Sequence, residues 1–407
     1  MFKYLKHDYV KMIKLPQIEF KKRIEKLGKI MQEKNLNGIY VSNTTTFKYL
    51  TDYYYIQTER PAAMLLDKNL EIHFFGPVME KEHALMQCPL IKDSFGYPDY
   101  PGEKHPLTYF SEWIKEIVKE GSLGTDNMNL YPSYWGFKPP SSSKTLSNLK
   151  LIDVNNYIFE LRKIKSKNEQ KIMRESSKWG NLAHSLLQKY TNPGLFDFEV
   201  ESKASTEANL AAMYSFGRDV RPPINYPLSI HAGFRGQVGE HSYYPHSLSV
   251  NRAIKKGDVL GSGASGNIDG YHIEIERNLF VGEPSNEAGK FHKLAVKMQN
   301  VAIDSLKIGM RLSEVDATVI RFAKEHDVLK YRLHHSGHCI GLEGHEAPFL
   351  DVGETAILED GMSFSVEPGI YVPHLGGFRH SDTVIMHEDG PEVITYYPNE
   401  TEELTIY

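Results

Sequence analysis

The chain has 407 residues, 41% hydrophobic and 24% charged, and a formal net charge of −5 at pH 7. This length exceeds one ordinary hydrophobic core, so two domains are expected. The small net charge argues against nucleic-acid binding and against a polybasic membrane arm. The two cysteines, Cys88 and Cys339, exclude a disulfide scaffold and favour a reducing compartment. We find no signal-peptide pattern in residues 1–20 and no membrane-spanning run. A cytoplasmic enzyme without nucleic-acid or membrane partners is therefore predicted.

Residues 1–155 alternate between helical and strand patterns and predict an αβ layered domain. One helical face is apolar at every third or fourth position: Phe20, Ile24, Leu27 and Met31. Short apolar runs predict strands at 38–41, 62–66 and 72–75. The turn-rich stretch 138–143 is expected near the end of this domain.

Residues 156–407 predict a second domain with long helices and paired strands. Ser166 and Glu169 have the spacing of a capping box, Ser285 suits the cap of the next helix, and Ser313 suits a third. Glycine turns precede apolar runs at 256–260 and 360–364, and a second strand follows each, at 271–280 and 378–385. This faint repeat suits an α+β domain of two related halves with a cleft between them.

Acidic and histidine residues gather in this second domain. Glu274 and Glu276 lie two apart on a predicted strand, so both carboxylates, with His272, should share one face. Glu367 lies inside a predicted apolar strand over 364–371, where a carboxylate is costly unless it has a partner. Together with the histidine-rich stretch 334–346, these residues predict a metal site or an acid–base site.

Structural roles compete with these functional ones. A single histidine is more often hydrogen-bonded or solvated than catalytic, which applies to His272, His334, His335 and His380. Glu274 and Glu276 could equally form an exposed strand face. Glu343 and Glu346 are interpreted as a solvated loop face, Arg277 as a structural ion-pair partner, and Cys339 as a packed small residue.

The motifs in order resemble the superfamily that holds methionine aminopeptidase, prolidase, Xaa-Pro aminopeptidase and creatinase. The resemblance is carried by Tyr-Leu-Thr-Asp at 49–52, Glu-Arg-Pro at 59–61, the stretch 161–169, Gly-His-Cys-Ile-Gly-Leu at 337–342, His-Glu-Ala-Pro at 345–348 and Glu-Pro-Gly at 367–369. It implies a creatinase-like N-terminal domain, residues 1–155, and a pita-bread catalytic domain with two pseudo-symmetric halves, residues 156–407.

The metallopeptidases of this superfamily use five ligands: Asp, Asp, His, Glu and Glu. In this chain those positions hold Ser262 or Gly263, then Glu274, His338, Glu367 and Ser381. Two hard cations need several anionic oxygens, so we expect that Glu274, His338 and Glu367 hold no metal pair and at most one weak divalent ion. Glu-Arg-Asn at 276–278 resembles creatinase and ectoine hydrolase, whose reactions need no metal. No cofactor is therefore expected.

The resemblance also implies roles for individual residues. His246 matches the general base and acid, and Glu367 and Glu276 match carboxylates that hold the substrate. His338 and His345 would orient the substrate or stabilise charge, and Glu274, His272 and Arg379 occupy substrate-facing positions. Arg60 matches an arginine that binds substrate carboxylate across a homodimer.

Three functions follow for comparison. The first is a metal-independent hydrolase that cleaves an amide or amidine C–N bond in a small zwitterionic compound. The second is a metal-dependent Xaa-Pro dipeptidase acting on a dipeptide. The third is a non-catalytic binding protein on the same fold, which the joint presence of His246, His338, His345 and Glu367 argues against.

Overall fold

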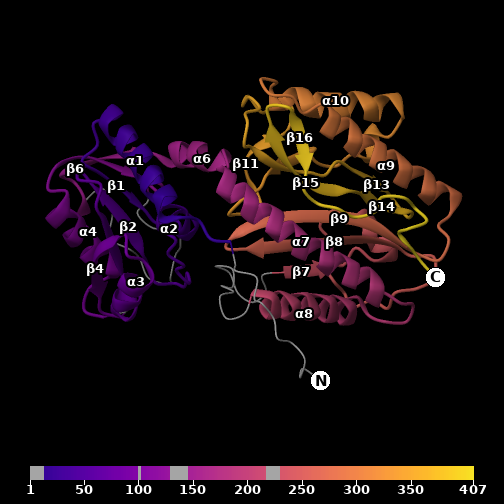
Figure 1. Cartoon of the computed structure of the whole chain (residues 1–407), viewed down its shortest axis with the longest axis horizontal. Helices are drawn as coiled ribbons and strands as arrows, with labels where there is room; N and C mark the ends of the chain where they lie inside the picture. The colour runs from indigo at the N-terminus through magenta and orange to yellow at the C-terminus, as the bar shows by residue number, and fades with distance from the viewer. Residues whose placement is uncertain (1–12, 100–101, 129–144, 217–229) are drawn as a thin grey trace. The chain divides into compact units, whose positions relative to one another are not determined.

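The computed structural model describes residues 13–99, 102–128, 145–216 and 230–407. The chain divides into two compact units that separate between Arg162 and Lys163 (Figure 1). The boundary predicted between residues 155 and 156 falls at the start of helix α6 (Asn155–Lys163). The turn-rich stretch 138–143 lies outside the described residues.

The N-terminal unit is built on a six-stranded sheet in the order β4-β3-β2-β1-β5-β6. Its strands are β1 (Gly38–Val41), β2 (Ala63–Asp67), β3 (Ile72–Pro77), β4 (Ile91–Tyr97), β5 (Gly121–Thr125) and β6 (Leu149–Asp153). Its helices are α1 (Gln17–Glu33), α2 (Thr44–Thr51), α3 (Lys81–Gln87) and α4 (Pro106–Ile117). The predicted apolar face of α1 is buried, and aromatic rings of Tyr40, Phe75, Phe110 and Trp113 pack together in the core.

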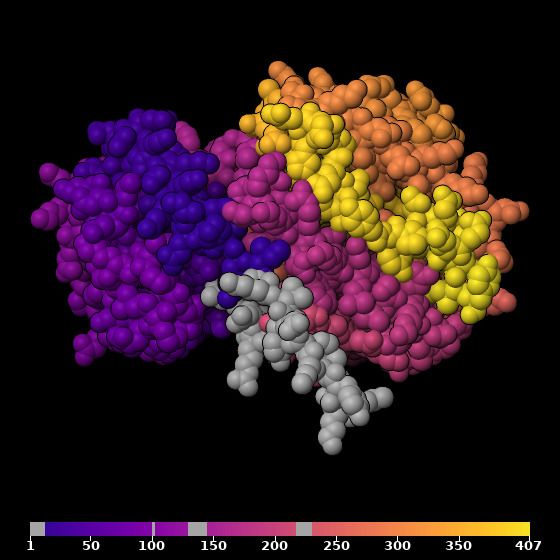
Figure 2. Space-filling view, in the orientation of Figure 1, coloured from indigo at the N-terminus to yellow at the C-terminus, as the bar shows by residue number. Residues whose placement is uncertain are grey.

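The C-terminal unit is built on a nine-stranded sheet whose main path runs β11-β10-β12-β15-β9-β8-β7. Its strands are β7 (Ile230–Gly233), β8 (Val259–Ile268), β9 (Tyr271–Val281), β10 (Gly337–Cys339), β11 (Glu346–Leu350), β12 (Ser363–Val366), β15 (Ser381–His387), β16 (Gly390–Val393) and β17 (Thr405–Ile406). A separate hairpin pairs β13 (Gly369–Val372) with β14 (Gly376–Arg379). Figure 2 shows the end of the chain as a yellow band on the surface of this unit.

Four helices cover this sheet: α7 (Lys167–Tyr190), α8 (Asp197–Phe216), α9 (Asn286–Asp304) and α10 (Leu312–Glu325). The predicted capping box of α7 is confirmed, because Ser166 accepts from Glu169 N and Glu169 accepts from Ser166 N. Ser285 caps α9, as predicted. Figure 1 shows α7 crossing the face of β8 and β9. A Cβ on Gly266 would lie 2.0 Å from Ser176 O, so this packing requires glycine.

Three local predictions are wrong. Helix α10 begins at Leu312, and its preceding residue Arg311 makes no side-chain cap, so Ser313 lies inside the helix. The strand predicted over 378–385 is broken at His380 into β14 and β15. The strand predicted over 364–371 is also broken, and Glu367 follows β12, where its backbone N donates to Ser336 O.

Candidate active site

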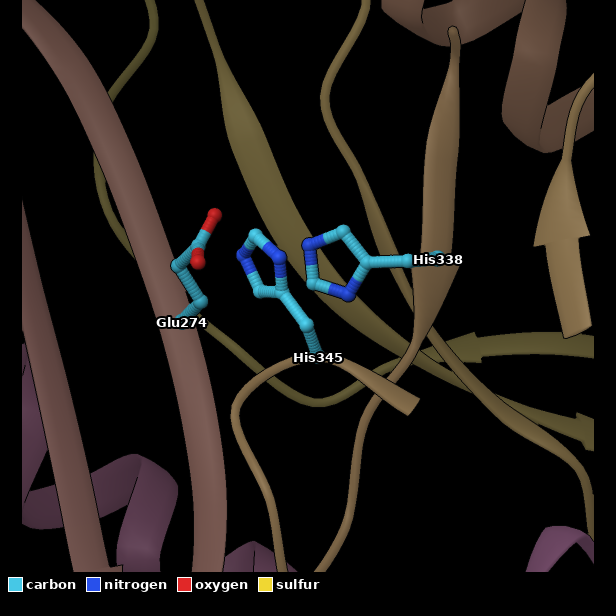
Figure 3. Close-up of side chains that lie close together, drawn as sticks. All are labelled: Glu274, His338 and His345. Atoms are coloured by element: carbon cyan, nitrogen blue, oxygen red, sulfur yellow. The ribbon is translucent and has the colours of Figure 1, made fainter. Parts of the chain in front are cut away.

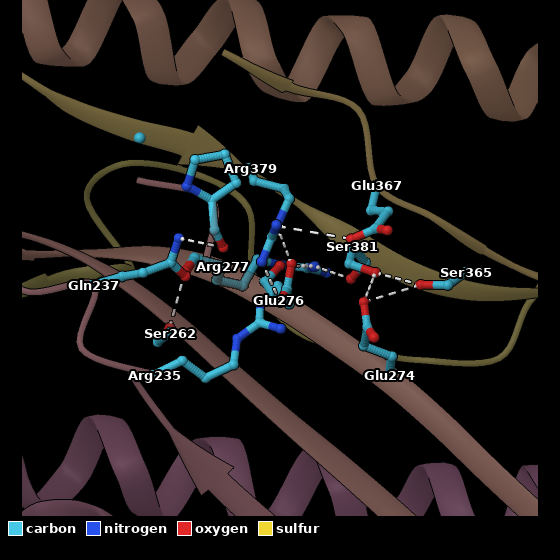
Figure 4. A network of polar contacts seen from close by, with 12 residues as sticks. Arg235, Gln237, Ser262, Glu274, Glu276, Arg277, Ser365, Glu367, Arg379 and Ser381 are labelled. Atoms are coloured by element: carbon cyan, nitrogen blue, oxygen red, sulfur yellow. Dashed lines mark hydrogen bonds and ion pairs between the residues drawn. The ribbon is translucent and has the colours of Figure 1, made fainter. Parts of the chain in front are cut away.

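Strand β9 presents two carboxylates to one side of the sheet. Glu274 and Glu276 share a face, while Ile273 and Ile275 are buried on the other. Across the hairpin, Glu276 pairs in register with Gly263 of β8. Oxygen atoms of Glu274, Glu276 and Glu367 lie within 4.8 Å of one another, so three carboxylates from two parts of the sheet converge (Figure 4).

Two histidines join Glu274 on its other side. His338 lies on β10, and His345 lies in the loop before β11 (Figure 3). Donor atoms of Glu274, His338 and His345 lie within 4.8 Å of one another, and the two imidazole centroids are 3.9 Å apart. His338 is buried, and its Nε2 makes no hydrogen bond, although Glu367 Oε1 is 3.3 Å away. An uncompensated buried nitrogen beside two carboxylates is the environment of a ligand or a proton carrier.

Burial and charge shift the protonation of this cluster. Burial lowers the pKa of His338, but Glu367 and Glu274 outweigh that effect and raise it to about 9. Burial and the charge of Glu274 raise the pKa of Glu367, and His338 opposes them. Burial lowers the pKa of His345, as does the charge of His338. His338 therefore holds a proton near neutral pH when no other cation is present.

Two arginines neutralise Glu276 (Figure 4). Arg235 Nη2 donates to Glu276 Oε1, and Arg379 donates to both carboxylate oxygens, with Nη2 2.6 Å from Oε1. Arg379 also donates to the hydroxyl of the buried Tyr371 at 3.1 Å. Because both oxygens of Glu276 are occupied, this residue positions the two guanidinium groups.

Arg235 faces a small cavity beside these carboxylates. Its side chain is 47% exposed, and its backbone has φ +50°, an uncommon conformation for a residue other than glycine. The cavity has a volume of about 180 Å³ and is lined by His231, Gly233, Arg235, Gly263, Ala264, Ser265, Glu274 and Glu276. A guanidinium and two carboxylates in one space of this size suit a zwitterionic group.

Small residues occupy the two positions at which the resemblance implies a metal-binding carboxylate. Ser381 Oγ and Ser365 Oγ both donate to Glu274 Oε1, at 2.9 and 3.1 Å. Ser262 Oγ is buried and donates to Arg277 O at 2.9 Å. A Cβ on Gly263 would lie 3.2 Å from Glu276 Cγ, so little space remains for a side chain there.

The remaining predicted site residues lie outside this convergence. His246 is exposed, and its charge reaches His334 closely enough to contribute to the lowered pKa of that residue, although burial is the main cause. His272 contacts Asn267 Nδ2 at 2.8 Å, and burial lowers its pKa to about 4. Arg60 belongs to the N-terminal unit, where Asp99 accepts from its Nε and Nη2 at 2.9 Å each.

The structural interpretations had different outcomes. Arg277 pairs with Asp382 at 3.0 Å and donates to backbone carbonyls, which confirms its structural role. Cys339 is buried, and both cysteines are unpaired. The solvated position expected for Glu346 is wrong, because this residue is buried and forms an ion pair with Lys165 at 3.1 Å. Lys165 is 181 residues from Glu346 in the sequence, so no local pattern indicates this ion pair.

Arg235 is the site residue that sequence reasoning missed. It follows β7 in a Gly-Phe-Arg-Gly stretch, and only the left-handed backbone at Arg235 and Gly236 aims its side chain at Glu276. Glycines flanking an arginine were the one available signal, because they permit such a turn.

The model of Metallopeptidase family M24 matches residues 171–388, and that of the Creatinase/Prolidase N-terminal domain matches residues 23–164. The chain belongs to metallopeptidase family M24. Its α+β architecture of a creatinase-like domain followed by a pita-bread domain is confirmed, as is its assignment as a C–N hydrolase.

The relatives of this M24 protein span almost its full length. It is 26% identical over 380 residues to the Xaa-Pro dipeptidase of Pyrococcus furiosus, covering 92% of this chain and 98% of that protein. It is 27% identical over 393 residues to an uncharacterized peptidase of Bacillus subtilis, covering 93% and 99%. The solved prolidase of Thermococcus sibiricus has a similar fold, with a TM-score of 0.79, 24% identity and coverage of 95% and 99%.

Two expectations need correction. The relatives named here are Xaa-Pro dipeptidases and peptidases, which does not support the placement beside creatinase and ectoine hydrolase. The expectation of no metal cofactor is wrong, because the family is a metallopeptidase family and the site clusters metal-capable donors. The sequence argument counted missing carboxylates and assigned His345 to the substrate, whereas the fold places it beside Glu274 and His338 as a further neutral donor.

The donors at this M24 site fit a divalent cation. Glu274, His338 and His345 supply one oxygen and two imidazoles from separate elements, and the buried His338 Nε2 has no hydrogen-bond partner. Mixed nitrogen and oxygen donors suit first-row ions such as Zn²⁺, Co²⁺ or Mn²⁺. The second cluster, Glu274, Glu276 and Glu367, fits less well because two arginines already neutralise Glu276. Within the described residues, no helix is long and apolar enough to cross a membrane.

Proposed function

We propose that this protein is a metal-dependent dipeptidase that hydrolyses the peptide bond of Xaa-Pro substrates. The observation that carries the proposal is the convergence of Glu274, His338 and His345, with Nε2 of the buried His338 3.3 Å from Glu367 Oε1 and in no hydrogen bond. Membership of family M24 and relatives named Xaa-Pro dipeptidase support it.

In this proposal Glu274, His338 and His345 hold the cation. When bound, the ion supplies a Lewis acid that polarises a carbonyl and makes water more acidic. His338 would bind the ion through a deprotonated Nε2, giving up the proton that Glu367 and Glu274 otherwise stabilise on it.

Glu367 accepts the proton of the attacking water. Its pKa is raised by burial and by Glu274, so its carboxylate is a stronger base than an exposed one. It lies 3.3 Å from His338 Nε2, at the edge of the donor cluster. His246 is assigned to return a proton to the leaving nitrogen on the strength of the resemblance alone, since its exposed imidazole lies outside the donor cluster.

Arg235 binds the carboxylate of the dipeptide. Only Nη2 is used by Glu276, and the half-exposed guanidinium faces the cavity with its other N–H groups. A planar guanidinium recognises a carboxylate in two-point fashion. Glu276 and Arg379 hold this group in place, since Glu276 bridges the two arginines.

The oligomeric state and location are also part of the proposal. The resemblance of Arg60 to an arginine that binds substrate carboxylate across a subunit boundary motivates a homodimer in which Arg60 approaches the partner's site. The existing contact of Arg60 with Asp99 would then have to rearrange. The two buried, unpaired cysteines favour a reducing compartment such as the cytoplasm.

The direct test joins metal content to peptide hydrolysis. Protein purified without chelator is analysed for metals, stripped, and reloaded with Zn²⁺, Co²⁺ or Mn²⁺. Each form is assayed on Xaa-Pro dipeptides and on matched Xaa-Ala dipeptides. We expect Xaa-Pro hydrolysis that disappears on stripping, returns on reloading and is lost in His338→Ala. Full activity of the stripped protein, or no dipeptide hydrolysis with any ion, would refute the proposal.

A further inference from the structure

A second group of metal-capable side chains lies on the hairpin between β2 and β3 in the N-terminal unit. Donor atoms of Asp67, Glu71 and His73 lie within 4.8 Å of one another. Asp67 ends β2, and the turn returns through Leu70 with φ +61° to Glu71 and β3. The three residues are therefore held by one short, paired segment of chain.

The turn fixes the orientation of the Asp67 carboxylate. Oδ1 accepts hydrogen bonds from the backbone N–H groups of Asn69 and Glu71, both at 2.9 Å. Oδ2 has one long contact within the turn, Asn69 Nδ2 at 3.3 Å. Oδ2 therefore keeps most of its acceptor capacity and is directed at His73.

His73 brings a buried nitrogen to the same place. The residue is 5% exposed, and its Nδ1 lies 2.9 Å from Asp93 Oδ1. An ionised carboxylate only accepts, so Nδ1 carries a proton, and in the neutral form of the ring Nε2 presents a lone pair. Nε2 makes no hydrogen bond, and the nearest charged atom is Asp67 Oδ2 at 3.5 Å.

Two lone-pair atoms that face each other in a buried place need a positive charge between them. A distance of 3.5 Å is long for a charge-assisted hydrogen bond. Two ligands about 2.1 Å from a tetrahedral Zn²⁺ would be about 3.4 Å apart, which matches the observed separation. The Asp93 contact at Nδ1 is the carboxylate–histidine arrangement that orients imidazole ligands.

We propose that Asp67, Glu71 and His73 bind a divalent cation of the Zn²⁺ class, separate from the catalytic site. Two carboxylates and a neutral imidazole balance its charge, and water completes the coordination. Lys92 contacts Glu71 Oε2, so the ion takes Oε1 or displaces that exposed ammonium. The ion cross-links the two ends of the hairpin and stabilises the N-terminal unit.

The test counts metal equivalents in the full-length protein. Wild type, His73→Gln and Glu71→Gln are titrated with Zn²⁺ and with Co²⁺. Binding is measured by calorimetry and, for Co²⁺, by visible absorption. The control is His83→Gln, an exposed histidine of the same unit. We expect His73→Gln to lose one equivalent of tight binding and Glu71→Gln to bind that equivalent at least tenfold more weakly. His83→Gln should match wild type, and dipeptide hydrolysis should be unchanged in all three variants.

The rival explanation is that a proton, not a metal, lies between His73 and Asp67. In that case the imidazole NMR signals of His73 would show a doubly protonated ring that Zn²⁺ does not alter. Equal metal stoichiometry in wild type and His73→Gln would overturn the proposal. Glu71→Gln guards against misfolding, because Glu71 is partly exposed and its loss leaves the contacts of the buried His73 with Asp67 and Asp93 intact.

Discussion

The hydroxyl of Ser381 donates a 2.9 Å hydrogen bond to Oε1 of Glu274, and Ser365 donates to the same oxygen. This pair of hydroxyls orients Glu274, the carboxylate shared by the two donor clusters of the active site. Groups that orient ligands commonly contribute 10- to 100-fold to metal affinity.

Ser381→Ala should therefore weaken binding of Mn²⁺ or Zn²⁺ at the active site by roughly 10-fold, with a larger effect in Ser365→Ala/Ser381→Ala. Isothermal titration measures the affinity. The control is Ser185→Ala, whose exposed hydroxyl bonds only to the preceding helical turn. Unchanged affinity in the double variant would mean that Glu274 is oriented by the backbone alone.

Glu367→Gln should reduce kcat/KM for an Xaa-Pro dipeptide by roughly 10²- to 10⁴-fold, because an amide cannot accept the proton of water. The fold should remain intact, since Gln has the same shape. Circular dichroism and thermal melting check the fold, and steady-state kinetics check the activity. Near wild-type turnover would remove Glu367 from the proton-transfer role.

Arg235→Ala should lower kcat/KM for dipeptides with a free carboxylate by roughly 10- to 100-fold, the loss of one or two charge-assisted hydrogen bonds. Dipeptide amides, which lack that charge, should be affected much less. Arg252→Ala is the matched control, because Arg252 pairs with the exposed Glu240. Equal losses for acid and amide substrates would indicate a structural role for Arg235.

Lys165 and Glu346 form an ion pair whose side chains are 1% and 2% exposed. Lys165→Met removes the ammonium 3.1 Å from a buried carboxylate and should cost about 3–5 kcal/mol in the free energy of unfolding. Lys165→Met/Glu346→Gln should recover part of that loss. Urea denaturation measures each value, and Lys167→Met, at a 69% exposed position, should change little. A small loss in Lys165→Met would show that water reaches the pair.

Acid should destabilise the C-terminal unit through its buried histidines. Burial lowers the pKa of His184 to about 3, that of His292 to about 4, and that of His380 well below its usual value. In the unfolded chain these histidines have the ordinary pKa of about 6.5. Their contribution to the free energy of unfolding is therefore complete above that pH and is lost as the pH falls below it. Each such histidine contributes a slope of up to about 1.4 kcal/mol per pH unit.

His380→Leu removes one of these groups and should flatten the decline in unfolding free energy between pH 6.5 and 5. Urea denaturation at several pH values measures the slope. His326→Gln, at an exposed position, should leave the slope unchanged. An identical slope in His380→Leu would mean that local opening protonates these rings without unfolding.

Local signals in the sequence were reliable where neighbouring residues decide the outcome. The capping box at Ser166 depends on four consecutive residues, and the shared face of Glu274 and Glu276 follows from the two-residue period of a strand. Motif order was enough to indicate the family and the architecture. Ser313 was misleading because Leu312 N takes its partner, Ala356 O, from a distant loop.

Distant contacts and backbone conformation explain why the sequence did not predict the positions of several site residues. Arg235 enters the site only through a left-handed turn, and Glu346 is buried by a lysine 181 residues away. His345 joins Glu274 because β11 pairs with β10, which no local pattern around Glu274 indicates. His345 was predicted as a site residue from the sequence, but its position among the metal donors comes from the tertiary fold, and the metal expectation was wrong for that reason.

Strands β8 and β9 are joined by ten successive residue pairs, from Val259 with Phe280 to Ile268 with Tyr271. Helix α7 closes directly on this ladder at Gly266. Amide protons along the centre of β9 should thus exchange with solvent only through the rarest opening events of the unit. The two carboxylates of β9 therefore lie on the most protected part of the sheet, whereas His345 lies in the loop before β11.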